Sequence, residues 1–410
     1  MKSFQLTLIA LVITLNLSCV SGQEKLPINK LQSTEKDNLI SIGRKFTLYS
    51  KILEEDKEIY ISLPHKYEEH VQTYPIIFTL EAELLFESAH TITKFMSARS
   101  KMPQSIVIGI TNGEYKKRNE MGFKKWGAKP DKYLKFIEQE LIPYIETNYR
   151  ANQHRTIIGL SPTTGLLFEA FFEKPELFKG YIALSAHLEW DIIPNSTLID
   201  KIISKLKEPN RPKTTLYLGR ADSDLKDGQY IQKAFDDAIH KLKNEKSITN
   251  CTIDILKNEE HYLMSIKGIR SGLASVYSNS IWRDPGLIGW DKTKNYARDY
   301  YKNYYDNLSS IYGFDIFPVE DGHAYGYYLA GVIYNAKRWG TNKQVIDLAE
   351  LGISYYPNSA KLHIQLAEAY KKEGKLKKAY TTAKKSIQLA KTFNPDELNK
   401  YLERFEELKK

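Results

Sequence analysis

Cysteine is scarce in this 410-residue chain, which contains only Cys19 and Cys251. We expect Cys19 to leave with an N-terminal export signal, so the mature chain would keep one thiol and could form no internal disulfide. Cys251 stands in a run of alternating apolar residues, which favours a buried strand thiol over a nucleophile. The sequence therefore excludes a fold held together by disulfides.

Several binding motifs are also missing. We find no spacing of metal-ligating residues, no glycine pattern of a dinucleotide-binding loop and no phosphate-binding loop. The net charge of +9 comes from lysines spread over the whole chain, and no nucleic-acid recognition motif accompanies it. We expect no metal, no cofactor and no nucleic-acid partner, and a solvated basic surface that could lie near anionic lipid or polysaccharide.

Long apolar runs are absent as well, because the N-terminal run at residues 6–17 is shorter than the roughly 20 residues that cross a bilayer. This run follows Lys2 and precedes small residues, which is the order of a secretory signal peptide over residues 1–22. The alternative is a lipoprotein signal ending at Cys19, but Asn16 stands where such signals usually carry leucine. We therefore expect a soluble exported protein, periplasmic or secreted, without a transmembrane span.

What the chain does contain is an alternation of strand and helix patterns. Short β-branched and apolar runs predict strands at residues 45–50, 58–63, 76–80, 105–110, 156–158, 180–184, 215–218 and 251–256. Helical spacing predicts helices at residues 84–98, 131–149, 166–173, 226–242 and from about 263. Strands that alternate with helices predict a mostly parallel sheet covered on both faces, with ligands at the carboxyl ends of the strands. Residues 23–281 are thus expected to form one α/β domain.

One tight turn in this domain carries a serine, Ser161, between a predicted buried strand and an apolar helix. In α/β-hydrolases such a turn is the nucleophile elbow, Gly-x-Ser-x-Gly, which exposes the serine hydroxyl above the sheet. Here residues 159–163 read GLSPT, so Pro162 has no N–H to lend to an oxyanion hole and Thr163 replaces the second glycine. The structural alternative is that Ser161 caps a helix that begins with proline.

Two further residues complete a candidate catalytic set. Asp222 follows the strand predicted at residues 215–218, with Asp224 as the reserve choice, and His261 follows the last predicted strand. Serine, acid and histidine thus occur in the chain order of α/β-hydrolases. His261 would take the serine proton while Asp222 orients the ring. Taken singly, a loop histidine is usually solvated and an aspartate after a strand is usually a turn residue.

Other residues near the predicted rim could contact a substrate. His187 and Trp190 follow the strand at residues 180–184, so they could line the pocket, although a surface loop is an equal alternative. A basic loop could attract an anionic substrate, although a solvated loop is the simpler interpretation; its cations are Lys116, Lys117, Arg118, Lys124 and Lys125.

The C-terminal part has a different pattern. In a connector at residues 282–318, an aromatic face with a four-residue repeat predicts a helix packed on a neighbour. Its members are Tyr296, Tyr300, Tyr304 and Leu308. Residues 319–410 contain two related units, 326–357 and 359–395, each with two helices around a glycine and a closing proline. A period near 34 residues is typical of tetratricopeptide repeats, which bind proteins or peptides. Because fewer than three repeats rarely stand alone, we expect this pair to lean on the connector or on the α/β domain.

Taken together, nearly the whole mature chain resembles the esterase branch of the α/β-hydrolases that includes the enterochelin (siderophore) esterases and esterase D, in the form with C-terminal tetratricopeptide repeats. The resemblance rests on residues 50–64, 74–77, 136–145 and 174–178 with the strand that follows. It implies an α/β-hydrolase fold followed by an all-α tetratricopeptide-like region. It also implies hydrolysis of a small ester without a cofactor, with Ser161 as nucleophile, His261 as base and Asp222 as acid.

Two features of that family are altered in this chain. The family's His-Ser-x-Gly-Gly is Leu-Ser-Pro-Thr-Thr at residues 160–164, and its Leu-Asp-Gly is Leu-Glu-Ala at residues 80–82. The resemblance therefore places Glu81, Ala82, Pro162 and Thr163 at the substrate's carbonyl oxygen, with the hydroxyls of Thr163 and Thr164 as candidate substitute donors.

Two hypotheses follow. In the first, the protein is an exported serine hydrolase that cleaves carboxylic esters through a Ser-His-Asp triad. In the second, the hydrolase fold has lost turnover and acts as a binding or scaffolding protein through its repeats. The retained serine, acid and histidine favour the first, whereas Pro162 and the missing glycines favour the second. We favour the first hypothesis because all three groups are present in order.

Overall fold

The computed structural model describes most of the chain, and residues 42–410 form one compact unit. The described residues are 41–193, 196–226, 229–282, 297–322 and 328–410. The signal peptide predicted at residues 1–22, and Cys19 within it, lie outside these residues. In the part described, no helix is both long and apolar enough to cross a bilayer.

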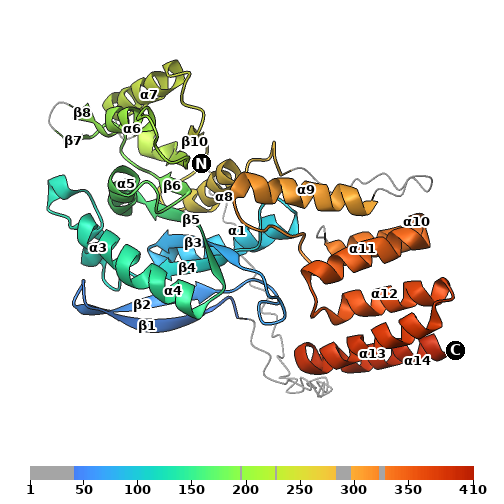
Figure 1. The fold of residues 1–410 in the computed structure, drawn as a ribbon. Helices are drawn as coiled ribbons and strands as arrows, with labels where there is room; N and C mark the ends of the chain where they lie inside the picture. Colours follow the sequence, from blue (N-terminus) through green and yellow to red (C-terminus); the bar gives the residue numbers. More distant parts are fainter. Residues whose placement is uncertain (1–40, 194–195, 227–228, 283–296, 323–327) are drawn as a thin grey trace, which may run out of the picture. The chain divides into compact units, whose positions relative to one another are not determined.

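An eight-stranded mixed sheet forms the centre of the first region (Figure 1). Its strands, in spatial order, are β1 (Arg44–Ser50), β2 (Glu55–Ser62), β4 (Ile106–Ile110), β3 (Tyr74–Leu80), β5 (Ala151–Leu160), β6 (Gly180–Leu184), β9 (Thr215–Ala221) and β10 (Cys251–Leu256). Strands β1 and β2 pair antiparallel, β2 pairs antiparallel with β4, and the remaining pairs are parallel. The mostly parallel sheet predicted from the sequence is therefore confirmed, with the predicted opening hairpin at its edge.

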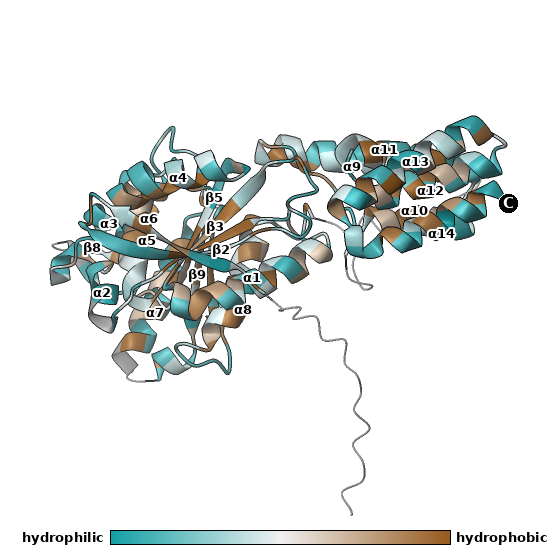
Figure 2. Ribbon diagram, turned by 90° about the horizontal axis from the view of Figure 1, so that it is seen from below, coloured by the Kyte–Doolittle hydropathy of each residue, from teal (hydrophilic) through white to brown (hydrophobic). Residues whose placement is uncertain are grey.

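Helices cover both faces of this sheet. On one face α1 (Ala82–Ala98) and α8 (Met264–Val276) share a core with alternate residues of the central strands. The other face is covered by α3 (Pro130–Phe136), α4 (Ile142–Asn148), α5 (Thr164–Glu173), α6 (Leu198–Leu206) and α7 (Gln229–Asn244). All seven residues of β3 are buried, as expected of a continuous apolar run in a parallel sheet. Figure 2 shows the hydrophobic residues concentrated on the central strands.

Smaller elements lie in the connections between the strands and the larger helices. They are α2 (Tyr115–Glu120), three 3₁₀ turns at Lys124–Trp126, Ser161–Thr163 and Ser223–Leu225, and a small hairpin of β7 (Asp191–Ile193) and β8 (Ser196–Thr197). The single helix predicted at residues 131–149 is instead interrupted by a π-helical turn, Ile137–Leu141. This widening precedes Pro143, which lacks the N–H that an α-helix would direct at residue 139.

The C-terminal region is entirely helical within the described residues. It contains α9 (Ala297–Tyr312), α10 (Leu329–Trp339), α11 (Asn342–Tyr355), α12 (Ala360–Lys372), α13 (Leu376–Phe393) and α14 (Leu398–Lys409), with a 3₁₀ turn at Pro395–Glu397. The predicted turn glycines separate α10 from α11 and α12 from α13, and Gly374 has the positive φ of 72° that favours glycine. That these pairs are tetratricopeptide repeats stays a prediction, as do the proposed domain boundaries.

The buried face of α9 agrees in part with the expected one, because Leu308 is fully buried and Tyr304 is half-buried against the core. The buried tyrosines are Tyr301 and Tyr305, which are each 2% exposed, whereas Tyr300 is 44% exposed. Tyrosines occur in adjacent pairs on this helix, so two faces one residue apart share the same four-residue spacing, and spacing alone does not decide between them. Tyr296, the first tyrosine of the expected face, lies outside the described residues.

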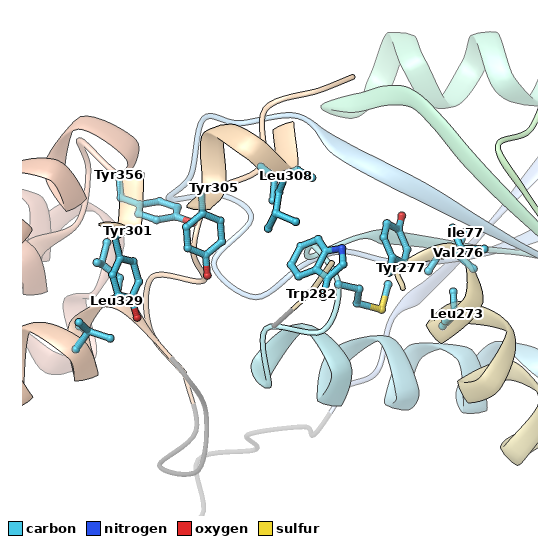
Figure 3. Close-up of a cluster of buried hydrophobic side chains, with 14 of the residues drawn as sticks. Ile77, Leu273, Val276, Tyr277, Trp282, Tyr301, Tyr305, Leu308, Leu329 and Tyr356 are labelled. Atoms are coloured by element: carbon cyan, nitrogen blue, oxygen red, sulfur yellow. The ribbon is translucent and has the colours of Figure 1, made fainter. Parts of the chain in front are cut away.

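A continuous apolar core links the sheet region to the C-terminal helices. Trp282, which is 1% exposed, packs near Tyr277 on one side, and Tyr305 and Leu308 follow on the other (Figure 3). The Trp282 ring N–H donates to the Tyr312 hydroxyl at 3.1 Å. The helical pairs therefore do not stand alone, because their core is continuous with that of the sheet.

A buried ionic cluster joins the same two regions. Glu320, which is fully buried, accepts hydrogen bonds from Lys66 at 2.8 Å and from Ser359, and lies 3.0 Å from the His70 ring. Burial alone would raise the pKa of Glu320, but these neighbours outweigh it and lower the pKa from 4.5 to about 2. Glu320 is thus held ionised where the C-terminal region meets the loop after β2.

Candidate active site

Ser161 lies at the carboxyl end of β5, on the corner that leads into α5. It opens the 3₁₀ turn Ser161–Thr163 with a φ of 56°, a left-handed conformation that is unusual for a residue other than glycine. Its side chain is half-buried and makes no hydrogen bond with any described residue, so it does not act as a helix cap. A strained, uncommitted serine on a strand-to-helix corner is the geometry of a nucleophile elbow.

A close contact fixes the first turn of α5 behind this serine. A Cβ atom on Gly165 would lie 2.2 Å from the carbonyl carbon of Gly122, so only glycine fits there. The Leu166 N–H donates to the Met121 carbonyl oxygen at 2.7 Å. The loop after β4 is therefore clamped onto the elbow helix, even though Thr163 and Thr164 replace the expected glycines.

His261 is oriented by a carboxylate, and that carboxylate is Asp224. The Nδ1 atom of His261 lies 2.9 Å from Oδ1 of Asp224, whose Oδ2 accepts a hydrogen bond from the Ser185 hydroxyl at 2.7 Å. A carboxylate only accepts, so Nδ1 carries the proton and Nε2 is left as the basic atom. Burial alone would raise the pKa of Asp224, but the hydrogen bonds from His261 and Ser185 outweigh it and lower the pKa.

Asp222, the first choice for the acid, has a different position. Its Oδ1 accepts the backbone N–H of Glu259 at 3.1 Å, and Lys226 lies 3.8 Å from its other oxygen. Backbone hydrogen bonds from Asn258 and Glu259 lower the pKa of this carboxyl. The structure thus brings the reserve residue, Asp224, to the histidine, while Asp222 ties down the loop that carries it. Asp222 precedes the 3₁₀ turn Ser223–Leu225 and Asp224 lies within it, so the two carboxylates reach different partners.

The position of the expected oxyanion loop is occupied by a buried ion pair. Glu81 precedes α1 with a φ of 67° and is 4% exposed. One of its carboxylate oxygens accepts a hydrogen bond from the Arg118 Nε–H group, and the other accepts one from the Thr163 hydroxyl at 2.9 Å. Burial raises the pKa of Glu81 against the opposing effect of Arg118 and Thr163.

The threonine hydroxyls of the elbow are already engaged. The Thr163 hydroxyl donates to Glu81, with the Leu160 carbonyl oxygen at 3.0 Å as its alternative acceptor, and it accepts the Leu160 N–H. The Thr164 hydroxyl donates to the Ser161 carbonyl oxygen at 2.6 Å. Each hydroxyl has one proton. Neither threonine is therefore available as a substitute oxyanion donor without breaking a bond.

Backbone N–H groups remain at the start of α1. The Glu81 carbonyl oxygen accepts the N–H groups of Leu84 and Leu85, which leaves those of Ala82 and Glu83 without an intrahelical acceptor. The Ala82 side chain itself is buried against β4. If Ala82 contacts a substrate oxygen, it does so through its backbone N–H.

His187 and Trp190 form a stacked pair at the end of β6. Their ring centroids lie 3.7 Å apart with an interplanar angle of 5°, and Trp190 meets the ring of Trp126 edge-on at 4.6 Å. Trp190 is 38% and Trp126 52% exposed, so two indole rings face solvent together. Below them, buried Arg220 donates to Glu189 at 3.0 Å. The stacked rings and the buried ion pair therefore hold this segment in place, so it is not a free surface loop.

Three of the four basic-loop cations whose side chains the structure describes pair with a carboxylate, and the Lys116 side chain lies outside the described part. Lys117 pairs with Glu55, Lys124 pairs with Glu169, and Lys125 donates to a backbone carbonyl oxygen. The exposed pairs among these contribute little to stability. The loop therefore presents less free positive charge than its sequence indicates.

Three residues of this rim were not predicted from the sequence. Ser185 follows β6 directly with a φ of 49° and bonds Asp224, while Glu189 and Arg220 form the ion pair below the aromatic rings. Only their position in the sequence could have indicated a role at the site, because Ser185 and Arg220 stand at the carboxyl ends of the neighbouring strands β6 and β9. A serine after a strand is too common to be chosen on that signal alone.

Sequence comparison finds a family and one curated relative. The family model described as "Putative esterase" matches residues 50–283. The relative is ferri-bacillibactin esterase BesA of Bacillus subtilis, 25% identical over 166 residues, which cover 34% of this chain and 56% of BesA. The chain therefore matches only about half the length of that relative.

Solved structures share the fold. An IroE-like serine hydrolase from Shewanella oneidensis is 20% identical, with a TM-score of 0.57 over 76% of this chain and 99% of its own. An uncharacterised protein from Capnocytophaga ochracea is 21% identical, with a TM-score of 0.52 over 90% of this chain and 99% of its own. The second match is long enough to include C-terminal helices. Because the family model covers more than half of the sequence, the chain belongs to the Putative esterase family.

Proposed function

We propose that this protein is an exported serine hydrolase that cleaves carboxylic esters through an acyl-enzyme, with Ser161 as nucleophile, His261 as base and Asp224 as the orienting acid. The observation that carries the proposal is the Asp224–His261 hydrogen bond on the same rim as a strained, uncommitted serine. No hydrogen bond joins Ser161 to His261 among the described residues, but such bonds commonly tighten only when a substrate binds.

The reaction proceeds in two halves. Ser161 Oγ forms a bond to the ester carbonyl carbon, its proton passes to Nε2 of His261, and the carbonyl π electrons move onto the oxygen. When that oxygen re-forms the double bond, the ester C–O bond breaks and the alcohol takes the proton from His261. Water then repeats the sequence on the acyl-enzyme and releases the acid and free Ser161.

Asp224 serves this cycle by stabilising the imidazolium. Its pKa is lowered by its hydrogen bonds, so it stays ionised when His261 becomes charged. Ser185 fixes the second carboxylate oxygen and so sets the direction of the first. Asp222 acts one step further away, by anchoring the backbone before His261.

For the substrate, we propose an ester of the siderophore class. The name of the relative BesA specifies a ferri-bacillibactin esterase. The exposed rings of Trp126, Trp190 and Tyr262 stand on the loops around the site, where they suit an aromatic or extended ester. An exported enzyme of this kind would act outside the cytoplasm.

For the C-terminal helices, we propose a pair of tetratricopeptide-like repeats that hold a protein or peptide partner. A hollow between them is lined by apolar and charged side chains, namely Ile333, Tyr334, Lys337, Val345, Gln365, Glu368 and Arg404. A scaffolding role without catalysis would use the same surface.

A covalent probe tests the proposed chemistry. The purified mature protein is treated with a fluorophosphonate, digested and analysed by mass spectrometry. We expect the label on Ser161, and its loss in Ser161→Ala and His261→Ala. Labelling of another serine, or labelling that persists in Ser161→Ala, would reject this assignment.

A further inference from the structure

Two exposed indole rings meet on the rim beside the serine elbow. The ring of Trp190, which follows β6, lies 4.6 Å from that of Trp126 between centroids, with an angle of 73° between the ring planes. The ring of Phe123 in turn meets Trp126 edge-on at 5.4 Å. Single exposed apolar side chains are common, but exposed apolar groups that lie together indicate a binding site.

Several contacts fix Trp190 in the absence of a ligand. Its ring lies 3.7 Å from the His187 ring, with 5° between the two planes. The His187 Nδ1 atom lies 3.1 Å from a carboxylate oxygen of Glu189 and 3.2 Å from Nη2 of Arg220, so the imidazole is held at its edge. Glu189 and Arg220 are buried and paired at 3.0 Å. Because the Trp190 ring is already fixed, it loses little side-chain entropy when it binds a ligand.

The turn that carries Trp126 is joined to the segment of Trp190. The Lys125 ammonium group donates to the carbonyl oxygen of Asp191, the residue after Trp190. The Leu198 N–H donates to the Trp190 carbonyl oxygen at 2.8 Å. The relative position of the two indole rings is therefore set by hydrogen bonds of the backbone as well as by their own contact.

Both rings lie near the proposed nucleophile. Gly122, four residues before Trp126, packs against Gly165 in the first turn of α5. Gly165 follows Ser161 by four residues, which is roughly one helical turn, or about 6 Å. The segment of Trp190 leaves β6, the direct neighbour of β5, at the same edge of the sheet. One ester molecule can thus place its carbonyl group at Ser161 and another group, several bonds away, at the indole rings.

The geometry of the indole pair favours a flat ring as that group. Two rings that stand nearly perpendicular form a corner, where a third ring can stack on the face of one and meet the other edge to face. Aromatic groups prefer these two arrangements over others. A saturated ring of the same size would fill the corner without making either contact.

The charges near the pair do not favour a cation. The charged side chains of the two segments, together with their ion-pair partners, balance one another: the cations are Lys124, Lys125 and Arg220, and the carboxylates are Glu169, Glu189 and Asp191. Indole rings also bind quaternary ammonium ions, but no excess of negative charge on these segments would strengthen such binding. The pair therefore suits an aromatic ring better than a cation.

We propose that Trp126 and Trp190 form a subsite for a planar aromatic group of the substrate, so that the protein acts on esters that carry an aryl group. This inference rests on the proposed function and narrows its substrate class. Trp126 and Trp190 contact the aryl group and determine specificity. His187 stacks on Trp190 and is a positioning residue. The subsite contributes to binding and transfers no proton.

Matched esters test this specificity. Ethyl esters of phenylalkanoic acids and phenylalkyl acetates, with chains of varied length, are each compared with the cyclohexyl counterpart, and a pH-stat follows hydrolysis by the full mature chain. In the best-matched pair we expect kcat/KM to favour the phenyl ester by about three- to tenfold, the range of an aromatic contact. Trp126→Leu and Trp190→Leu should each bring this ratio close to one, chiefly through KM, and Trp190→Phe should keep most of it.

Control variants separate specificity from structure. Trp339→Leu removes an exposed indole at the end of α10, so its ratio and its kcat/KM should equal those of the wild type. His187→Ala should lower the ratio in part, and His187→Phe, which keeps a stacked ring, should restore it. A wild-type ratio near one in every pair would overturn the inference and leave the proposed esterase intact. So would variants of Trp126 and Trp190 that lower kcat/KM for both esters equally.

Binding without turnover distinguishes this inference from the proposed reaction. Ser161→Ala with nitrogen-15-labelled tryptophan gives an indole N–H signal for each of the five tryptophans, and Trp126→Phe and Trp190→Phe identify two of them. We expect 3-phenylpropanol to shift these two signals at several-fold lower concentration than 3-cyclohexylpropanol, with the Trp339 signal unchanged. Tighter binding of tetramethylammonium ion, or no shift of the two signals, would overturn the inference. If the two signals shift but the wild type hydrolyses no ester, the proposed function fails while the aromatic subsite stands.

Discussion

The two sides of Ser161 are built differently. On the histidine side, Asp224 is joined to His261 at 2.9 Å and to Ser185 at 2.7 Å, and its pKa is lowered by these hydrogen bonds. On the oxyanion side, Glu81 is buried with its pKa raised, and it pairs with Arg118 where a small loop would be expected. The histidine side thus carries the acid–histidine pair that the proposed acyl transfer requires, while the other side carries a buried ion pair in place of the expected loop.

This difference suits a site of the proposed kind, in which the oxyanion donors can change while the serine, histidine and acid are kept. A nucleophile, base and acid act as one unit, so the loss of any one removes most of their effect. Oxyanion stabilisation depends only on positive charge or donors at one point, and different groups can supply it. Pro162 therefore argues against a particular donor and not against the reaction.

The largest expected effect concerns the acid. Asp224→Asn should lower kcat on nitrophenyl esters by about 10⁴-fold, because the amide no longer fixes the basic tautomer of His261. Asp222→Asn is the matched comparison, since it alters the neighbouring aspartate that only anchors the loop. We expect its loss to be about tenfold or smaller. If the two losses were reversed, Asp222 would be the acid, and the histidine side would not be as the structure shows it.

A second prediction concerns Glu320, a buried carboxylate outside the site, and serves as a comparison for the site variants. Glu320→Gln should lower the free energy of unfolding at pH 7 by about 3 kcal/mol, from its pKa of about 2 against 4.5. The wild-type contribution is complete above pH 4.5 and is lost as the pH falls through 2, so the difference between the two proteins should vanish there. Denaturant titrations at pH 7 and at pH 2 measure this difference.

Turnover provides the control for that variant. Glu320 interacts with Lys66, His70 and Ser359. The loop that carries Lys66 and His70 lies at the amino ends of the parallel strands, because β2 pairs antiparallel with β4. We therefore expect kcat of the folded variant to match the wild type. If Glu320→Gln had the same free energy of unfolding as the wild type at pH 7, the buried cluster would not stabilise the fold as predicted.

A smaller effect is expected on the oxyanion side. Pro162→Ala restores an N–H group at a φ that alanine readily adopts, and it should raise kcat by about tenfold. An unchanged kcat on nitrophenyl esters would show that an N–H group at residue 162 does not reach the oxyanion.

The sequence was sufficient to predict the sheet, but it was not sufficient to predict the contacts between the loops of the sheet. Runs such as residues 76–80 are almost wholly apolar, so their burial as parallel strands follows from composition. The choice between Asp222 and Asp224 depends on a 3₁₀ turn whose geometry no local pattern encodes. The bond between Glu81 and Thr163 joins residues 82 positions apart, so the two altered motifs could be noticed separately but not seen as partners.

The most direct test of the account is whether turnover depends on Ser161. Hydrolysis of a series of short nitrophenyl esters would be measured for the purified mature protein and for Ser161→Ala. We predict measurable turnover by the wild type, with an initial burst from the acyl-enzyme, and none above background by the variant. Turnover by the wild type no greater than that of Ser161→Ala would contradict it, and the hydrolase fold would then serve as a scaffold for the C-terminal helices.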